Sequence, residues 1–212
     1  MALAVVAGCS SDSGGPQVIR STTTTTSLTA GLPAPLVDFL DGVAAPGSLA
    51  FRASYQVLQK LGGKQTDVEV VSDPPSWQVR VGDLIVVDGP DPATCRTSTK
   101  RCVGQVREQL LAPTGVFSRF FASGTAQALA TDARRVAAGD PVLSARTVAG
   151  VALRCAGIPL GTSTVSTYCL TAEGVFGWVD TPSVHVELTA YRPGPPGEST
   201  GVPYAIVKGT QP

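Results

Sequence analysis

Apolar and polar residues alternate along most of residues 146–192, which is the pattern expected for half-buried β-strands. In the last run, Val184, Val186 and Leu188 fall on one face, and the polar residues between them fall on the other. Three breaks hold the Gly, Pro, Asp or Ser residues that tight turns need, and they lie at 158–163, 172–174 and 180–183. The segment therefore predicts an antiparallel meander of four strands.

The first half of the chain shows the same alternation. Its runs predict four more strands, at about 51–57, 67–70, 77–81 and 84–87. Before them, residues 35–42 predict a short helix, because Pro35 suits a first helical turn and Gly42 the position after a helix end. After them, the polar segment between Cys95 and Cys102 predicts a loop.

Two further helices are expected midway along the chain. Phe117, Phe120 and Phe121 have the i, i+3, i+4 spacing of an amphipathic helix within residues 113–122. A second helix is expected at 125–138, where the apolar stripe is Ala126, Leu129, Ala130, Ala133, Val136 and Ala137. The residues of this stripe are mostly small, so the helix presents a slim apolar face.

The order of these elements predicts an α+β fold. About eight or more antiparallel strands have to bury one face of a sheet, and three short helices are available to cover it. A twisted sheet of this width tends to curl. We therefore expect a strongly curved sheet, an incomplete barrel, with a helical lid on its concave side. The small residues of the second helix predict an apolar cavity beneath it; the alternative is a solid core of ordinary density.

Four of the five cysteines form two close pairs, Cys95 with Cys102 and Cys155 with Cys169. In a hairpin centred near residue 162, the second pair faces across neighbouring strands. Metal binding is the alternative, but no CxxC spacing occurs and the sole histidine lies elsewhere in the chain. Two disulfides are therefore expected, which implies an oxidising compartment outside the cytoplasm.

The fifth cysteine, Cys9, follows a short apolar run that ends in Val6-Ala7-Gly8. This run resembles the lipobox of bacterial lipoproteins, in which the cysteine sulfur carries the lipid anchor. Residues 1–9 are then the remnant of a signal peptide whose basic start lies upstream of this sequence. With two or more acyl chains such as palmitate, the anchor would hold the protein at the extracytoplasmic face of the cell membrane. The alternative is a disordered apolar N-terminus with a free thiol.

Residues 10–33 consist mainly of Ser, Thr, Gly and Pro and contain five consecutive threonines. This stretch cannot bury enough apolar surface to fold alone, so it predicts a disordered tether. The domain organisation is then a signal-peptide remnant at 1–9, a tether at 10–33 and one folded domain at 34–212.

Composition and charge exclude several classes of function. The formal net charge is zero and only 15% of residues are charged, so no basic surplus exists for nucleic acid. An enzyme is not expected, because His185 is alone and alternates outward with Glu187 on a strand. The glycine-rich fragments match no phosphate loop, and no cofactor or metal is expected.

Several stretches together resemble the LolA-like lipoprotein-carrier superfamily, and more closely its actinobacterial lipoproteins of the LppX and LprG type. The matching residues are FRASY at 51–55, DPPSWQV at 73–79, the loop between Cys95 and Cys102, ARTVAG at 145–150, TYCLTAEGV at 167–175 and VELTAY at 186–191. The resemblance covers about residues 36–207. It implies a curved, incomplete barrel with a helical lid and an apolar cavity for acyl chains.

The leading hypothesis is therefore a membrane-anchored envelope protein that binds or transfers lipid. The residues expected to line the lipid cavity are Phe51, Tyr55, Val57, Val70, Trp77, Val79, Phe117, Phe120, Phe121 and Leu129. The second hypothesis is an envelope adaptor or sensory domain with a filled core that binds a protein partner. In either case, the final run at 203–207 is expected to close the sheet edge or to present a contact.

Overall fold

The computed structural model describes residues 28–45, 47–135, 137–161, 163–197 and 200–207. Over these residues eleven strands form one antiparallel sheet in the order β6-β5-β4-β3-β2-β1-β11-β10-β9-β8-β7. The strands of the first half are β1 (Phe51–Gln59), β2 (Lys64–Asp73), β3 (Ser76–Val81), β4 (Leu84–Asp88), β5 (Ala93–Arg96) and β6 (Arg101–Val103). Those of the second half are β7 (Val142–Val148), β8 (Val151–Pro159), β9 (Val165–Leu170), β10 (Phe176–Asp180) and β11 (Val184–Pro193).

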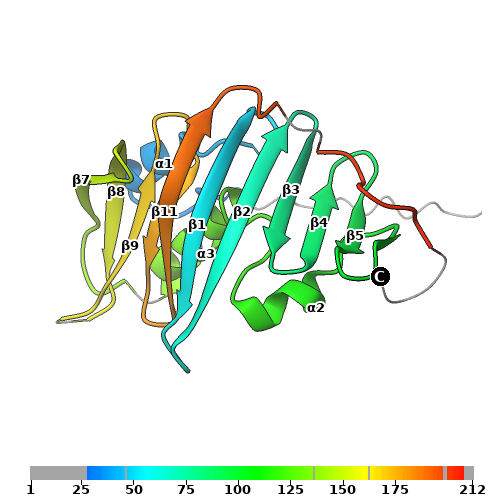
Figure 1. Cartoon of the computed structure of the whole chain (residues 1–212). Coiled ribbons are helices and arrows are strands. Elements are labelled where there is room, and N and C mark those ends of the chain that lie inside the picture. Colours follow the sequence, from blue (N-terminus) through cyan, green and yellow to red (C-terminus); the bar gives the residue numbers. More distant parts are fainter. Residues whose placement is uncertain (1–27, 46, 136, 162, 198–199, 208–212) are drawn as a thin grey trace, which may run out of the picture.

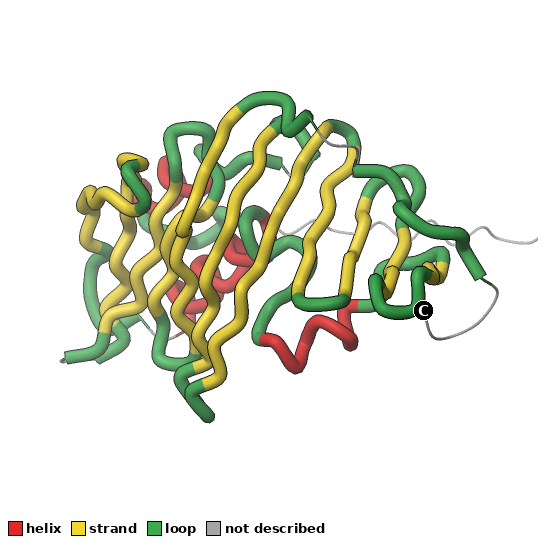
Figure 2. Tube along the Cα trace, in the orientation of Figure 1, coloured by secondary structure: helices red, strands yellow, loops and turns green. Residues whose placement is uncertain are grey.

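The sheet is strongly curved, and the predicted fold class is confirmed. α1 (Ala34–Asp41) and α3 (Ser123–Arg135) lie behind the sheet in Figure 1, on its concave side. Figure 2 shows the same arrangement, with the opposite face of the central strands free of helices. β1 and β11 pair at the centre. The first meander runs from β1 outward to β6, and the second runs from the edge strand β7 inward to β11.

The second meander has five strands where the alternation predicted four. The run from Arg146 to Cys155 is not one strand, because Ala149 and Gly150 form a tight turn between β7 and β8 with φ of 50° and 78°. The polarity pattern did not predict this turn, because apolar residues flank it on both sides and the alternation continues through it. The expected turns near 160, 173 and 182 all connect neighbouring strands.

The segment from Cys95 to Cys102 is also more regular than predicted. It forms the hairpin of β5 and β6, in which the two cysteines face each other across the strands. Cys155 and Cys169 face each other in the same way across β8 and β9. Both predicted disulfides are confirmed, with sequence separations of 7 and 14 residues.

The helix predicted at 113–122 is wrong. The chain instead forms the single turn α2 (Glu108–Leu111) and the 3-10 turn η1 (Ala112–Thr114), which ends at Gly115 with a φ of 77°. The three phenylalanines follow in tight turns, where Phe120 and Phe121 are buried and Phe117 is 40% exposed. Two successive turns, closed by the Phe120 and Ala122 N–H groups, place Phe120 and Phe121 inward. Their sequence spacing therefore matches that of a helix although no helix forms here. The next helix, predicted at 125–138, is present as α3 at Ser123–Arg135.

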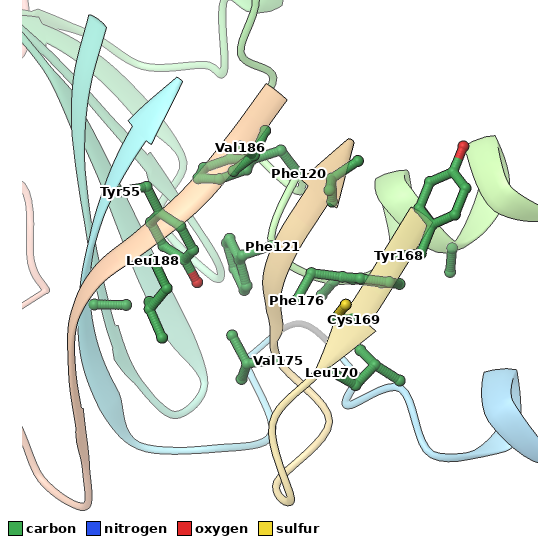
Figure 3. Close-up of a cluster of buried hydrophobic side chains, with 14 of the residues drawn as sticks. Tyr55, Phe120, Phe121, Tyr168, Cys169, Leu170, Val175, Phe176, Val186 and Leu188 are labelled. Carbon is green, nitrogen blue, oxygen red and sulfur yellow. The ribbon is translucent and has the colours of Figure 1, made fainter. Parts of the chain in front are cut away.

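The main core fills the space between the concave face and the helices. Phe120 packs edge-on against Tyr55 with ring centroids 5.0 Å apart, and Phe121 packs against Phe51 at 5.6 Å. Ala126, Leu129 and Ala130 are the buried apolar residues of α3, in agreement with its predicted stripe. Figure 3 shows part of this cluster between the central strands and α3.

A second, smaller core lies on the other face of β4 and β5. Its residues alternate with those of the main core and are Ile85, Val87, Ala93, Cys95 and Cys102. Val202 and Tyr204, from the C-terminal residues 200–207, pack over it. Ile206 then forms a parallel bridge with Cys102 of β6. The expectation that the C-terminal run closes a sheet edge is thus met by the edge at β6.

The described chain begins within the predicted tether. Leu28 and Leu32 pack against the main core, and the Arg134 side chain of α3 donates to the carbonyl oxygen of Ala30 at 2.9 Å. Residues 28–32, which were predicted as part of the tether, therefore pack on the folded domain. Cys9 and most of the predicted tether lie outside the described residues. Within the described part, no helix is both long enough and apolar enough to cross a membrane.

Candidate binding groove under α3

A groove of about 470 Å³ opens between α3 and the concave face of the sheet. This volume falls within the range of small-molecule sites. We call it the α3 groove; its walls are α3, the loop at residues 115–120, the sheet, and the turn between β10 and β11. It is not part of the solid core, because Ala128, Phe117 and Pro182 line it and are also exposed to solvent.

The floor of the α3 groove is a row of apolar residues on neighbouring strands. Val57 of β1, Val186 of β11 and Val179 of β10 come from strands that pair in register, since Val186 is the partner of both other valines. Tyr168 of β9 is in turn paired with Val179. Strand alternation explains this row, because residues at matching positions in neighbouring strands share a face.

One side wall is the loop at 115–120, which is held rigidly. The backbone N–H of Ser118 donates to the Glu108 carboxylate at 3.0 Å, and the Ser118 hydroxyl donates to the same carboxylate. Phe117 lies against Gly124 of α3, where a Cβ atom would come within 1.9 Å of the Phe117 ring. Only glycine at 124 permits this close approach, and it keeps the exposed Phe117 ring at the mouth of the groove.

The polar part of the groove lies where α3 meets β9. The Tyr168 hydroxyl donates to the Asp132 carboxylate of α3 at 2.6 Å, and Tyr168 is only 1% exposed. Burial and the neighbouring Asp132 raise the pKa of Tyr168 far above its usual range. The hydroxyl therefore stays protonated and keeps joining α3 to β9. Figure 3 shows the Tyr168 ring beside the helix.

Three of the ten residues predicted to line a cavity do line the α3 groove: Val57, Phe117 and Phe120. The others pack in the main core away from it; they are Phe51, Tyr55, Val70, Trp77, Val79, Phe121 and Leu129. Beneath β2 and β3 the interior is therefore filled, as the alternative of a solid core predicted. Trp77 illustrates this, because its indole N–H donates to the Ser118 carbonyl oxygen at 3.2 Å within the packed interior.

The sequence interpretation missed the groove residues of the C-terminal half. Asp132 and Tyr168 belong to no recognisable sequence motif. The turn residues 181–183 have the composition of an ordinary turn, which does not indicate a ligand site. A signal was available for Val184 and Val186, whose alternation places them on the buried face of their strand.

His185 lies on the helix-free face of β11. Its ring is 4.4 Å from the Trp178 ring, and its Nδ1 atom is 3.2 Å from the Asp180 carboxylate. Burial raises the pKa of Asp180, but Lys60 and His185 outweigh burial, so this pKa is lower than usual. The histidine is half-buried among partners rather than fully solvated as expected.

No group of three or more metal-ligating side chains occurs among the residues that the structure describes.

This geometry defines the class of the molecule. Over the described residues, the wide, curved antiparallel sheet with α1 and α3 on its concave side is the LolA-like fold, as the sequence resemblance predicted.

The particular likeness is to MucB. A crystal structure of MucB matches with a TM-score of 0.53 and 15% identity, over 78% of this chain and 62% of that chain. The Pseudomonas aeruginosa MucA/MucB complex gives a TM-score of 0.49 and 15% identity, over 82% and 64% of the two chains. MucB in complex with MucA(peri) gives 0.45 and 14%, over 82% and 62%.

At these identities the likeness concerns the fold alone, and the chain spans less than two thirds of the MucB chains. No protein-family model matches the sequence, and no curated protein matches it. The closer resemblance to actinobacterial lipid carriers therefore stays a prediction.

Proposed function

We propose that this protein is a non-enzymatic binding protein of the cell envelope whose α3 groove takes the acyl chain of a lipid. The observation that carries the proposal is the groove itself, an opening of about 470 Å³ whose floor is a row of valines beside the packed main core. Apolar side chains that stay accessible in a well-packed protein are typical of a ligand site. The sequence resemblance to lipid carriers of the LppX and LprG type supports the same class of ligand.

The groove can be tested by filling it from α3. Ala128 lines the groove, and replacing it by Trp adds a large side chain where the ligand would lie, without removing any core residue. Gln127 is also exposed on the same helix and is not among the groove residues, so Gln127→Trp is the matched control. The measurement is saturable binding of an uncharged fluorescent alkyl probe to delipidated protein, together with mass spectrometry of lipid that co-purifies with the protein.

We expect the unchanged protein and Gln127→Trp to bind the probe with similar affinity. Ala128→Trp should weaken binding at least about tenfold, a loss of about 1.4 kcal/mol. The proposal is wrong if the unchanged protein shows neither saturable probe binding nor co-purified lipid.

The envelope location belongs to the same proposal. Cys9 would carry the lipid anchor, and the two disulfides suit an oxidising compartment. Expression with labelled palmitate should label the protein and fractionate it with membranes, and Cys9→Ala should abolish both. Membrane association that survives Cys9→Ala would contradict the anchor.

A second candidate function is the binding of a partner protein. MucB, whose fold this chain shares, has been solved in complex with MucA, so the structural neighbours favour this candidate. Among the described strands, β7 ends the sheet order and pairs only with β8, and it carries Val142 and Leu143 at 62% and 54% exposure. An open strand edge with exposed apolar residues can accept a strand of another protein.

A photo-crosslinking residue at position 143 tests this candidate in cells. The control position is Leu61, which is 81% exposed and lies in the turn between β1 and β2, far from β7 in the sheet order. A discrete protein adduct at 143 and none at 61 would support a partner at β7. Equal crosslinking at both positions would count against it.

A further inference from the structure

We propose that Asp132 makes the α3 groove select alkyl ligands whose polar end donates a hydrogen bond, an alcohol or an amine, and reject those that end in a carboxylate. This inference rests on the proposed function. It concerns the chemical type of the ligand's polar end group, which the apolar floor of the groove does not determine.

The first observation is the charge of the lining. Among the lining residues that the structure describes, Asp132 carries the only formal charge. The nearest lysines on the β1–β2 hairpin have other partners, since Lys60 pairs with Asp180 at 2.8 Å and Lys64 donates to the Pro113 carbonyl oxygen at 2.9 Å. Among the described lining residues, a ligand carboxylate would therefore meet a negative charge and no positive one.

The second observation is that the hydroxyl groups at the groove already donate hydrogen bonds within the protein. Tyr168 donates to Asp132, and Thr125 donates to the carbonyl oxygen of Phe120. Thr181 donates to the Val184 carbonyl oxygen at 3.1 Å and accepts from the Val184 N–H at 3.1 Å, and its oxygen lies 3.3 Å from that of Ser183. The groove therefore offers mainly acceptors to a ligand, and Asp132 is the strongest of them.

These two observations lead to one ranking of ligands. An alkylamine donates and is positively charged, an alcohol donates without charge, and a carboxylate can only accept. Hydrogen bonds to charged groups contribute more than those between neutral groups. A ligand carboxylate that faces only acceptors can form no hydrogen bond with them and stays unpaired. The expected order of affinity is amine, then alcohol, then acid.

The experiment uses three ligands with the same sixteen-carbon chain: hexadecylamine, hexadecanol and hexadecanoate. Each competes with the uncharged fluorescent probe on the full-length protein at pH 8 and low salt. We expect hexadecanoate to compete at least about tenfold more weakly than hexadecanol. Raising the salt should shrink this gap, because part of it is charge repulsion at a partly exposed site.

Asp132→Asn assigns the effect to one residue. The amide keeps one acceptor oxygen, removes the charge and adds a donor, so the disadvantage of hexadecanoate should fall to within about threefold. Tyr168→Phe is the companion variant, because it leaves Asp132 charged and frees its acceptor. It should keep or widen the gap, which a merely structural loss would not do.

The outcomes separate this inference from the proposed function. If none of the three ligands displaces the probe and the probe itself does not bind, the proposed function fails and the inference with it. If all three bind within about threefold of one another, the groove binds alkyl chains but the inference is overturned. If the gap persists unchanged in Asp132→Asn, the assignment to Asp132 is overturned.

Discussion

The two faces of the sheet are covered in different ways. On the concave face, α3 lies behind the central strands and leaves the α3 groove. On the other face, residues 200–207 lie over β4 and β5, and Val202 and Tyr204 pack directly onto the second core. One cover leaves space for a ligand, and the other leaves the core closed.

The difference follows from the shape of each cover. An α-helix is a stiff cylinder about 10 Å across, so it can touch a curved sheet only along part of its length. The small residues Ala126 and Ala130 let α3 approach closely on one side, while Ala128 faces an opening on the other. An extended segment bends residue by residue, so it can follow a twisted strand and bridge to its edge, as Ile206 does at Cys102. A helical cover over a curved sheet is therefore the place to look for a ligand site.

The largest expected effect separates the two covers by stability. Ile85 is 1% exposed in the second core, so Ile85→Ala should lower the free energy of unfolding by about 2–5 kcal/mol. Probe affinity should not change, because Ile85 faces away from the groove. Urea unfolding followed by tryptophan fluorescence, with a probe titration on the same sample, measures both. Weaker probe binding in this variant would show that the two regions are coupled.

The two disulfides should differ in a smaller way. Removing Cys155–Cys169 by a double alanine change should cost about 3 kcal/mol, and removing Cys95–Cys102 about 2.5 kcal/mol, because the first closes the longer loop. Only the first change should weaken probe binding, since Cys169 is the neighbour of Tyr168 in β9. Urea midpoints and probe affinities of the two double variants test this. Equal loss of probe binding in both would break the comparison.

The alkaline stability of the protein should report on the polar wall of the groove. Burial raises the pKa of Tyr168, so the folded state favours the protonated hydroxyl. This contribution is complete below about pH 10 and is lost as pH rises above it, by up to about 1.4 kcal/mol per pH unit. Thermal unfolding between pH 9 and 11 should show a shallower decline in Tyr168→Phe than in the unchanged protein.

Tyr191 provides the comparison for that measurement. Burial raises its pKa to about 12, and the residue is half-exposed, with its hydroxyl 3.2 Å from Glu173. Both tyrosines stay protonated in the folded state up to about pH 11, so the two variants should flatten the decline by similar amounts between pH 9 and 11. Above about pH 12 the contribution of Tyr191 should level off while that of Tyr168 continues to fall. A contribution of Tyr168 that levels off first would mean that Tyr168 is more accessible to solvent than its contact with Asp132 implies.

The smallest effect is expected on the helix-free face. The Arg52 guanidinium donates to the Glu69 carboxylate at 2.8 Å, and both side chains remain partly exposed. Exposed ion pairs contribute little, so Glu69→Gln should lower the free energy of unfolding by less than about 1 kcal/mol. Urea unfolding at low and high salt measures this, and a loss well above that value would indicate a buried role for the pair.

Polarity patterns predicted the sheet well and the groove poorly. Strand alternation depends on which side of the backbone faces the core, and this is encoded residue by residue. It failed at Ala149, where a non-glycine residue turns at positive φ within an apolar run, and in the short β5–β6 hairpin, where polar residues hide the strands.

The groove depends on shape rather than on polarity. Val57 and Val79 have the same alternation in sequence, but α3 leaves room over the first and the core fills the space over the second. The contact of Asp132 with Tyr168 joins residues 36 positions apart and follows only from how α3 lies on the sheet. No local pattern carries that information.

The most direct test of the account is a backbone NMR titration of the isotopically labelled protein with hexadecanol. We predict saturable shifts at the amides of Ala128, Asp132 and Val184, which line the α3 groove, and none at Ile85 or Val87 in the second core. Shifts confined to the second core, or no saturable shifts at all, would contradict the claim that the helical cover leaves a binding site.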